Sequence, residues 1–244
     1  MLKLRVHIVP IGFEIDRVIE PLIRLRADKV WLVVDDTIET SDASVHYKKV
    51  KERVHELKID FDERRCDIQS LFDLLNIYRT IIEEEQHHQI FINVSTGSKI
   101  EAIAGMMAAM IFNSETIDAT PYYVVPENYE ITPKKGQQLT SGFKRIIQLP
   151  NYKIERPKAA LISALKIIQD NDSASKKILI EKFIAKKLIV IESDHTEAAK
   201  HSQLNKKYLD PLSQKGLIDV MGKGKAARIK ITEDGNNILK FLPK

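Results

Sequence analysis

The sequence predicts an α/β protein in which a Rossmann-like, mostly parallel sheet with helices on both faces is followed by a small winged helix-turn-helix domain. Over residues 1–125, short apolar runs alternate with longer amphipathic segments, which is the pattern of successive strand–helix units. Over residues 158–244, amphipathic helical segments are followed by two short strands around a basic, glycine-containing turn. This change of pattern predicts two domains with separate roles.

The strands and helices of the first domain follow from the spacing of apolar residues, because strand faces repeat every two positions and helical faces every three or four. The expected strands cover residues 6–9, 30–34, 59–65, 89–94, 120–125 and 143–149, and the expected helices cover 14–27, 43–57, 70–85 and 100–112. Ligands bind such sheets beyond the carboxyl ends of the parallel strands. The turns that follow the strands are therefore the places to search for a site.

The second domain is predicted to contain three helices, a hairpin and a last helix. The expected helices cover residues 158–170, 175–187, 202–215 and 233–241, and the expected strands cover 217–220 and 228–231. Ser175 and Thr232 stand where helix N-caps are expected. Pro211 should bend the C-terminal part of the third helix, because its ring removes a backbone hydrogen bond.

Charge divides the chain at the same place as the pattern. Residues 1–150 hold 19 Lys and Arg against 23 Asp and Glu, a balance of −4, whereas residues 151–244 hold 19 against 11, a balance of +8. The polar stretch 151–157 is expected to be a linker, so the second domain covers 158–244. A basic domain of this kind indicates a nucleic-acid partner, here DNA, although a solvated lysine-rich surface is an equal alternative.

Composition excludes several classes of protein. No run of about 18 apolar residues exists in the chain of 244 residues, so no transmembrane helix and no membrane partner are expected. Cys66 is the single cysteine, which rules out stabilising disulfides and a zinc site built from cysteines. A reducing, cytoplasmic setting is expected.

The turn after the fourth expected strand is the strongest functional signal. It consists of Asn93, Val94, Ser95, Thr96, Gly97, Ser98 and Lys99, between an apolar run and a helix rich in small residues. Hydroxyls, unpaired backbone N–H groups and one lysine then meet at a helix N-terminus, where anions are held. Helix capping alone is the alternative explanation. Lys99 weakens it, because a cation in the first turn opposes the helix dipole unless an anionic ligand is present.

Two further turns are expected at the same edge of the sheet. One contains Pro10, Ile11, Gly12 and Phe13, and the other contains Asp35 and Asp36. Gly12 permits close approach of the backbone, and Phe13 is suited to stacking on a base or to packing in the core. Asp36 is suited to ribose hydroxyls or to a solvated turn.

Common cofactor motifs are missing. The first turn lacks the GxGxxG pattern of dinucleotide-binding proteins, and Gly97, Ser98 and Lys99 lack the upstream loop of a P-loop. The adjacent His87 and His88 have no third ligand at a useful spacing, so no metal site is expected. We therefore expect no cofactor and no ordinary NAD enzyme or P-loop NTPase.

The candidate DNA-binding residues belong to the third helix and the hairpin of the second domain. They are Gln203, Asn205, Lys206, Lys207 and Tyr208 on the helix, and Lys223, Lys225, Arg228 and Lys230 on the wing. Lysine, arginine, glutamine and asparagine side chains are suited to phosphates and base edges. A winged domain used only for protein docking or dimerisation is the alternative.

The turn Asn93 to Lys99 and the turn Pro10 to Phe13 together resemble the CARF domain, the CRISPR-associated Rossmann fold. The second domain is similar to winged helices, with Lys215, Gly216, Leu217 and Ile218 before the wing and Ile231, Thr232, Glu233, Asp234 and Gly235 after it. The combination resembles the archaeal CARF–winged-helix regulators of CRISPR-Cas systems, and the resemblance spans nearly the whole chain.

The resemblance implies a homodimeric transcription regulator of antiviral defence, with a ligand pocket across the two-fold axis. The ligand expected is a cyclic oligoadenylate, most often the tetramer, and the DNA partner is bound by the winged domain. By position, the pocket residues are Pro10, Ile11, Gly12, Phe13, Asp36, Ser95, Thr96, Gly97, Ser98 and Lys99.

Two alternatives remain from the sequence. One is a slow ring nuclease, in which Thr96, Ser98 and Lys99 would be the catalytic candidates through positioning and charge stabilisation, without a dedicated base. The other is a regulator that senses a different nucleotide in the same pocket. The Arg–His spacing of the HEPN ribonuclease domains that accompany other CARF domains is absent from the C-terminal half.

Overall fold

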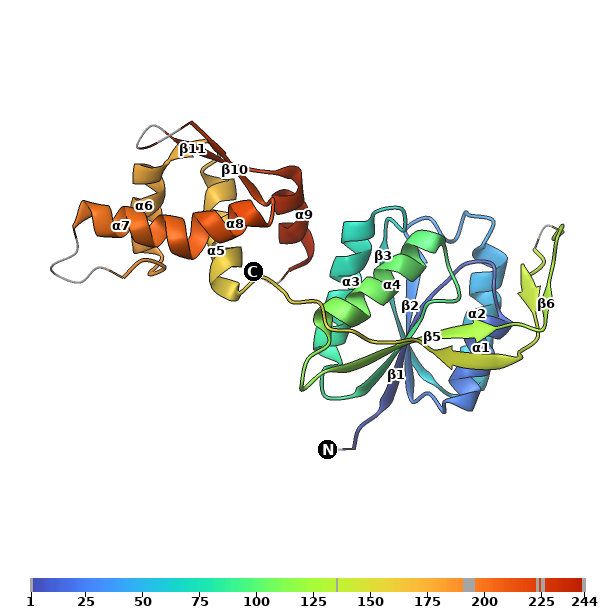
Figure 1. Cartoon of the computed structure of the whole chain (residues 1–244). Coiled ribbons are helices and arrows are strands. Elements are labelled where there is room, and N and C mark those ends of the chain that lie inside the picture. The colour runs from blue at the N-terminus through green and yellow to red at the C-terminus, as the bar shows by residue number, and fades with distance from the viewer. Residues whose placement is uncertain (1, 135, 191–195, 223, 225–226, 243–244) are drawn as a thin grey trace. The chain divides into compact units, whose positions relative to one another are not determined.

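The computed structural model describes residues 2–134, 136–190, 196–222, 224 and 227–242. The chain divides into two compact units, residues 1–155 and 156–244, and the division falls inside the stretch predicted as a linker (Figure 1). We call them the N-terminal unit and the winged unit. Within the described ranges, every helix is too short or too polar to span a bilayer.

The N-terminal unit is built on a six-stranded sheet of order β3-β2-β1-β4-β5-β8. Its strands are β1 (Arg5–Pro10), β2 (Lys29–Asp35), β3 (Asp60–Cys66), β4 (Gln89–Asn93), β5 (Asp118–Val125) and β8 (Arg145–Gln148). The first five are parallel, and β8 pairs antiparallel with β5 at one edge. In the centre, Ile8 of β1 lies opposite Trp31 of β2 and Ile92 of β4. The predicted mostly parallel, Rossmann-like sheet is confirmed.

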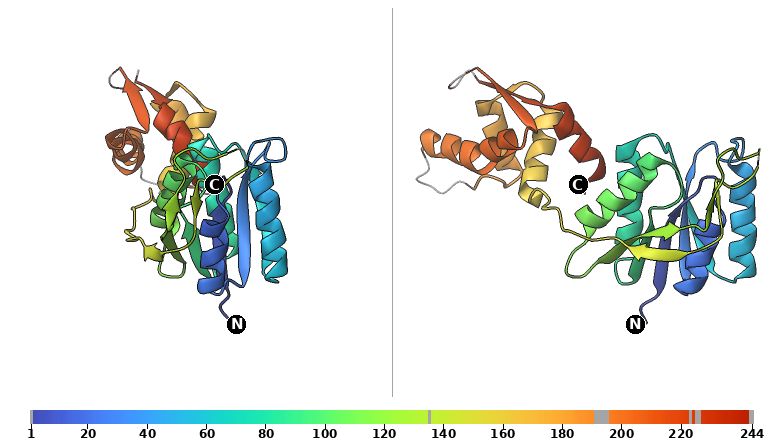
Figure 2. Two further views of the ribbon diagram at one scale, coloured as in Figure 1. Left: turned by 90° about the vertical axis from the view of Figure 1, so that its right-hand side faces the viewer. Right: turned by 45° about the vertical axis from the view of Figure 1, so that its right-hand side comes forward.

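Helices cover both faces of this sheet, α1 (Asp16–Arg24) and α2 (Ser44–Glu56) on one side and α3 (Leu71–Glu84) and α4 (Lys99–Phe112) on the other (Figures 1 and 2). The central strands are therefore buried on both faces and carry continuous apolar runs. Val30 and Leu32 are fully buried, and so are their neighbours Val33 and Val34. This packing fixes where each strand ends, and so where each turn lies.

The order in which successive strands are added to the sheet reverses between β1 and β4. The chain builds β2 and β3 on one side of β1 and then returns to place β4 and β5 on the other. A crevice forms at such a switch point, because the connections after the two strands lead to helices on opposite faces. Here the two connections are residues 11–15 and 94–98.

A small hairpin, not predicted from the sequence, closes over the start of α1. It consists of β6 (Asn128–Tyr129) and β7 (Thr140–Ser141). The side-chain oxygen of Gln138 accepts hydrogen bonds from the backbone N–H groups of Ile15 and Asp16, at 2.8 and 3.0 Å. Helix α1 has no side-chain cap at Ile15 itself, so the hairpin satisfies donors that the helix leaves open.

The winged unit contains helices α5 (Ala159–Asp170), α6 (Lys176–Ala185), α7 (Glu197–Leu204), α8 (Asp210–Gln214) and α9 (Glu233–Phe241), with a π-helical segment η1 (Asn205–Leu209) between α7 and α8. Strands β9 (Ala174–Ser175), β10 (Ile218–Met221) and β11 (Arg228–Ile231) form an antiparallel sheet of order β10-β11-β9. The predicted winged helix architecture is confirmed. The hydroxyl oxygens of Ser175 and Thr232 accept from the N–H groups of Ile178 and Gly235, as N-caps.

The third helix of the winged unit differs from the prediction in its start and its shape. It begins at Glu197, five residues before the predicted start at residue 202, with the Thr196 hydroxyl as its N-cap. Its middle widens into the π segment, where the N–H of Asp210 donates to the carbonyl of Asn205. Pro211 follows directly and has no N–H to give to the preceding turn, so the widened turn accommodates it.

Candidate ligand-binding turn and DNA-facing surface

The turns after β1 and β4 touch through their glycines. A Cβ atom added to Gly12 would lie 3.1 Å from the Cα of Gly97 and 3.3 Å from its nitrogen. A side chain at Gly12 would press on the Gly97 backbone, which would have to shift by a few tenths of an ångström. The sequence predicted that Gly12 allows close approach of the backbone. In the structure, the backbone that comes close is that of Gly97, on the opposite wall of the switch point.

Gly97 has two reasons to be glycine. Its φ of +72° lies in the left-handed region, and an added Cβ would lie 2.7 Å from Oε2 of Glu101 and 2.9 Å from Cβ of Pro10. Neither contact can be relieved by an exposed side chain, because Glu101 and Pro10 are both buried. The turn thus has a fixed backbone shape.

We expect Gly97→Ala to destabilise the N-terminal unit by at least about 2 kcal/mol, because the left-handed backbone alone costs about 1–2 kcal/mol for an L-residue and the clash adds to it. Urea denaturation followed by the fluorescence of Trp31 measures this unit selectively, because Trp31 is the only tryptophan. Gly136→Ala is the matched control: its φ is +79°, but an added Cβ meets nothing within 4 Å. Equal losses in both variants would contradict the proposed close packing.

Three polar side chains of the turn hold its shape rather than face solvent. The Thr96 hydroxyl donates to the carbonyl of Pro10 at 2.8 Å, which fastens the turn to β1. The Asn93 carbonyl oxygen accepts from the N–H of Ser95 at 2.9 Å and from its hydroxyl, and the Asn93 amide donates to the carbonyl of Arg17 at 2.9 Å. All three residues are at most 9% exposed.

The exposed part of the turn consists of Gly97, Lys99 and the backbone at the start of α4. Within the described ranges, the N–H groups of Lys99 and Ile100 have no hydrogen-bond acceptor, and the Lys99 side chain is exposed and forms no ion pair. Two open donors and one cation at the N-terminus of a 14-residue helix suit an oxyanion. The structure thus has Lys99 in the first turn of α4, where the sequence predicted it, and anion binding there stays a prediction.

Helix α4 also carries a capping box. The Ser98 hydroxyl oxygen accepts from the N–H of Glu101 at 3.2 Å, while Oε2 of Glu101 accepts from the N–H of Ser98 at 2.6 Å. Glu101 is fully buried, and burial raises the pKa of its carboxyl to about 7, with a smaller contribution from the Asp35 carboxylate. Sequence reasoning missed Glu101, although the spacing Ser98-x-x-Glu101 is the signature of a capping box.

The other predicted ligand-binding residues divide into buried and exposed groups. Pro10, Ile11, Ser95 and Thr96 are buried, Gly12 and Ser98 are half-buried, and Phe13, Asp36, Gly97 and Lys99 are exposed. The Phe13 ring is 40% exposed and packs edge-on against His46, with the ring centroids 5.6 Å apart. Asp36 lies in the exposed turn after β2. Pro10 and Ile11 can therefore offer only backbone atoms to a ligand.

A buried ion pair behind the first turn was also missed. Arg17 and Glu14 are 6% and 5% exposed, with 3.8 Å between Nη1 and Oε1. Nε of Arg17 donates to the carbonyl of Val124 at 3.1 Å, and the Thr140 hydroxyl donates to Glu14 at 2.6 Å. This pair joins α1, β5 and the β6–β7 hairpin, and so it supports the wall that carries Gly12 and Phe13.

The DNA-facing surface predicted for the winged unit is basic and hollowed. Lys206, Lys207, Arg228 and Lys230 are exposed. A groove of about 590 Å³ lies between the start of α6, the third helix and the wing; its lining residues are Lys176, Ala198, His201, Ser202, Asn205, Lys206, Asp210 and Gly224. The predicted Lys223 and Lys225 lie outside the described residues.

Tyr208 is not part of this surface. It is 6% exposed, its hydroxyl donates to the carbonyl of Leu188 at 2.6 Å, and its ring packs edge-on against Phe183 at 5.1 Å. We therefore reassign Tyr208 from the predicted DNA-binding set to the core. Gln203 is half-buried, with its side-chain oxygen enclosed and without a partner among the described residues.

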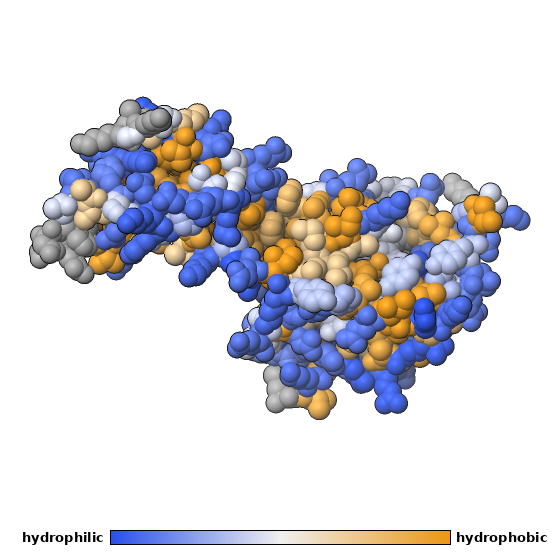
Figure 3. Space-filling view, in the orientation of Figure 1, coloured by the Kyte–Doolittle hydropathy of each residue, from blue (hydrophilic) through white to orange (hydrophobic). Residues whose placement is uncertain are grey.

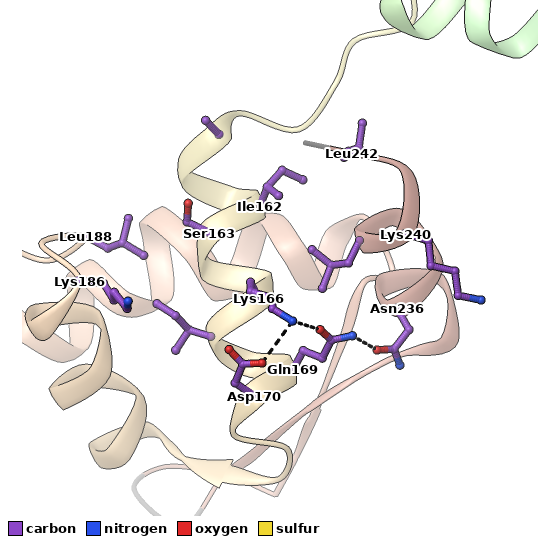
Figure 4. A pocket seen from close by; sticks show the side chains of 13 residues that line it. Ile162, Ser163, Lys166, Gln169, Asp170, Lys186, Leu188, Asn236, Lys240 and Leu242 are labelled. Carbon is purple, nitrogen blue, oxygen red and sulfur yellow. Dashed lines mark hydrogen bonds and ion pairs between the residues drawn. The ribbon is translucent and has the colours of Figure 1, made fainter. Parts of the chain in front are cut away.

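A larger cavity of about 920 Å³ lies elsewhere on the winged unit (Figure 4). Its wall is formed by α5, α9 and the segment around Lys186 and Leu188. Nζ of Lys166 contacts Asp170 and Gln169, and Gln169 in turn bonds to Asn236. None of the predicted ligand-binding or DNA-binding residues lines this cavity.

Comparison with known families gives two matches that follow the domain division. The family described as HFX_2341_N-like, N-terminal, matches residues 5–129, just over half of the chain. The family described as DUF6293 C-terminal winged helix domain matches residues 160–243. The uncharacterized protein MJ1513 of Methanocaldococcus jannaschii is 35% identical over 152 residues, which are 59% of this chain and 45% of that protein. The chain thus spans less than half the length of this relative.

Solved structures show more distant similarity. Csm6 of Enterococcus italicus bound to cyclic hexa-2'-fluoro-hexa-dAMP has 12% identity and a TM-score of 0.46, over 88% of this chain and 57% of that one. Can2 of Sulfobacillus thermosulfidooxidans in complex with cyclic tetra-adenylate has 13% identity and a TM-score of 0.39, over 97% and 63%. Protein VC1899 of Vibrio cholerae has 12% identity and a TM-score of 0.43, over 97% and 64%.

Proposed function

This chain belongs to the HFX_2341_N-like, N-terminal family, and from that premise we propose that it is a cyclic-oligoadenylate-sensing, DNA-binding transcription regulator linked to CRISPR-Cas. The observation that carries the proposal is the contact of Gly12 with Gly97 at the switch point of the sheet, beside the open N–H groups of α4 and the exposed Lys99. The winged unit supplies the DNA-binding output.

The surface of α4 supports a homodimer with the ligand between the two copies. Ile100 and Ile103 are 37% and 49% exposed, and apolar side chains gather over α4 in the space-filling view (Figure 3). Exposed apolar patches of this kind mark interaction surfaces. Since Lys99 and Ile100 are adjacent, a second copy packed on this face would bring two anion-binding turns to one interface, and a ring of phosphates would meet both.

Binding without cleavage fits the turn better than a ring nuclease. The Thr96 hydroxyl is committed to the carbonyl of Pro10, and the Ser98 hydroxyl oxygen to the N–H of Glu101. Lys99 is then the one predicted catalytic candidate whose functional group is free of hydrogen bonds in the described turn. The positive charge of Lys99 is suited to attracting a phosphate group.

We expect purified protein to bind cyclic tetra-adenylate, and Lys99→Ala to weaken this binding at least about tenfold, because charge-assisted hydrogen bonds contribute about 1.5–3 kcal/mol. Isothermal titration calorimetry measures the affinity for cyclic tetra-adenylate and compares it with the affinities for cyclic hexa-adenylate and ATP. Lys3→Ala is the matched control, because Lys3 precedes β1 and so lies at the amino ends of the parallel strands, away from the turns at their carboxyl ends. Tighter binding of ATP than of every ring would replace the ring ligand by an ordinary nucleotide, and linear products after long incubation would establish cleavage.

The same protein is expected to bind duplex DNA with an affinity that cyclic tetra-adenylate changes. Lys206→Ala and Lys207→Ala should each reduce the slope of log affinity against log salt by about one, whereas Lys158→Ala at the start of α5 should not. Fluorescence anisotropy at several salt concentrations measures both effects. A DNA affinity that does not change with salt concentration would refute the DNA-facing surface. A DNA affinity that does not change when cyclic tetra-adenylate is added would refute the coupling.

A further inference from the structure

The carboxyl group of Glu101 lies directly beneath the turn to which the proposed ligand binds. Its Oε2 accepts the N–H of Ser98 at 2.6 Å, and an added Cβ on Gly97 would meet the same oxygen at 2.7 Å. The residue is 0% exposed, and its second oxygen, Oε1, has no hydrogen-bond partner in the described part of the chain. A negative charge is thus buried just below an anion-binding surface.

The groups that face this carboxyl do not neutralise it. From α3, the hydroxyl of Tyr78 is fully buried and lacks a partner among the described residues, and burial and the charge of Glu101 raise its pKa. From β2, the Asp35 carboxylate raises the pKa of Glu101. From β3, the Cys66 thiol has its own pKa raised by burial and by the charges of Glu101, Asp36 and Asp73. On its own helix, Lys99 points to solvent and makes no ion pair with it within the described residues.

Both features favour the uncharged form of Glu101. Desolvation penalises the carboxylate, and the negative charge of Asp35 acts in the same direction. In the absence of ligand its pKa is about 7. A phosphate bound at the exposed side of the turn brings another negative charge close to this buried carboxyl, and this raises the pKa further.

We propose that Glu101 is a positioning residue that takes up one proton when an anionic phosphate group binds at the turn. The proton comes from solvent and forms an O–H bond at Oε1, while Oε2 continues to accept the N–H of Ser98. The turn keeps its shape, and the buried negative charge is removed. This inference rests on the proposed function only in the identity of the ligand, because any phosphate at the turn would have the same effect.

Proton uptake makes the affinity depend on pH with a definite sign. Above pH 7, where the free protein carries Glu101 as carboxylate, binding must consume a proton, so the association constant should fall by up to about tenfold per pH unit. Below about pH 6, Glu101 is already protonated and the dependence should vanish. Glu101→Gln retains an oxygen that can accept the N–H of Ser98 but carries no charge, so it should bind as well at pH 8.5 as at pH 6.

The test is calorimetric titration of the full chain at pH 8 in buffers of different ionisation enthalpy, with two probes: cyclic tetra-adenylate and inorganic phosphate. We expect wild type to take up close to one proton with at least one probe, Glu101→Gln to take up none and to bind more than about fivefold tighter, and the exposed control Glu115→Gln to behave as wild type. Uptake with phosphate alone would retain the inference and reject the ring ligand. Binding without uptake, uptake retained in Glu101→Gln, or no binding of either probe would overturn the inference.

Discussion

Replacing Glu101 by glutamine is expected to stabilise the N-terminal unit by about 3 kcal/mol at pH 8 and by less than about 1 kcal/mol at pH 5. The folded pKa of about 7 lies above the ordinary value of 4.5. The folded state therefore binds more protons than the unfolded state between these values, and its stability falls as pH rises from 4.5 to 7. Above pH 7 the unfavourable free energy of burying the Glu101 carboxylate is fully present. The glutamine variant lacks this cost because its side chain is uncharged.

Urea denaturation at both pH values, followed by Trp31 fluorescence, measures this difference, since Trp31 lies in β2 of the same unit. Glu115→Gln is the control, because Glu115 is exposed beyond the end of α4. A stabilisation of the same size at pH 5 and pH 8 would indicate a packing effect and contradict the titration of Glu101. Loss of stability at pH 8 would mean that the charged capping bond outweighs desolvation.

Replacing Tyr208 by alanine is expected to lower the stability of the winged unit by about 3–5 kcal/mol, the range for large aromatic truncations in a core. The ring packs against Phe183, and both belong to the cluster that includes Leu204, Leu209 and Leu212. Tyr208→Phe removes only the hydrogen bond to Leu188 and should cost about 1 kcal/mol.

The two substitutions separate a core residue from a DNA-binding residue. Thermal unfolding by circular dichroism measures the stability, and anisotropy measures DNA affinity under conditions where each variant is folded. We expect Tyr208→Phe to bind DNA as wild type does, whereas Lys206→Ala binds more weakly. A stable Tyr208→Phe protein that loses DNA affinity would return Tyr208 to the DNA-facing surface.

Tyr208 illustrates why the sequence predicted some residues of the winged unit and not others. Leu204, Tyr208 and Leu212 recur every four positions, which is a core stripe on a helix. The prediction instead treated residues 203–208 as one exposed face, because Lys206 and Lys207 are basic and Asn205 is suited to base edges. The start of this helix was also displaced, since Thr196 caps it.

In the N-terminal unit, the predictions that depended on local signals agree with the structure. Apolar runs gave the strands, and the turn Asn93 to Lys99 is followed by α4. The β6–β7 hairpin was missed because its contacts are remote: Gln138 bonds to Ile15, 123 positions away. Glu101 was missed for a different reason. Its capping pattern is local, but the burial of its carboxyl arises from the packing of α3, β2 and β3.

The π segment of the third helix has a consequence for how this part of the chain can change by deletion. A π turn contains one residue more than an α-turn. Removing one residue between Asn205 and Leu209 would keep the apolar stripe in phase but would close the widened turn that accommodates Pro211. The same deletion elsewhere in the helix would shift the apolar stripe by about 100° relative to its core. The extra residue of the π segment therefore sets how the helix part before it, which faces the wing, is rotated relative to the part after Pro211, which ends at the hairpin.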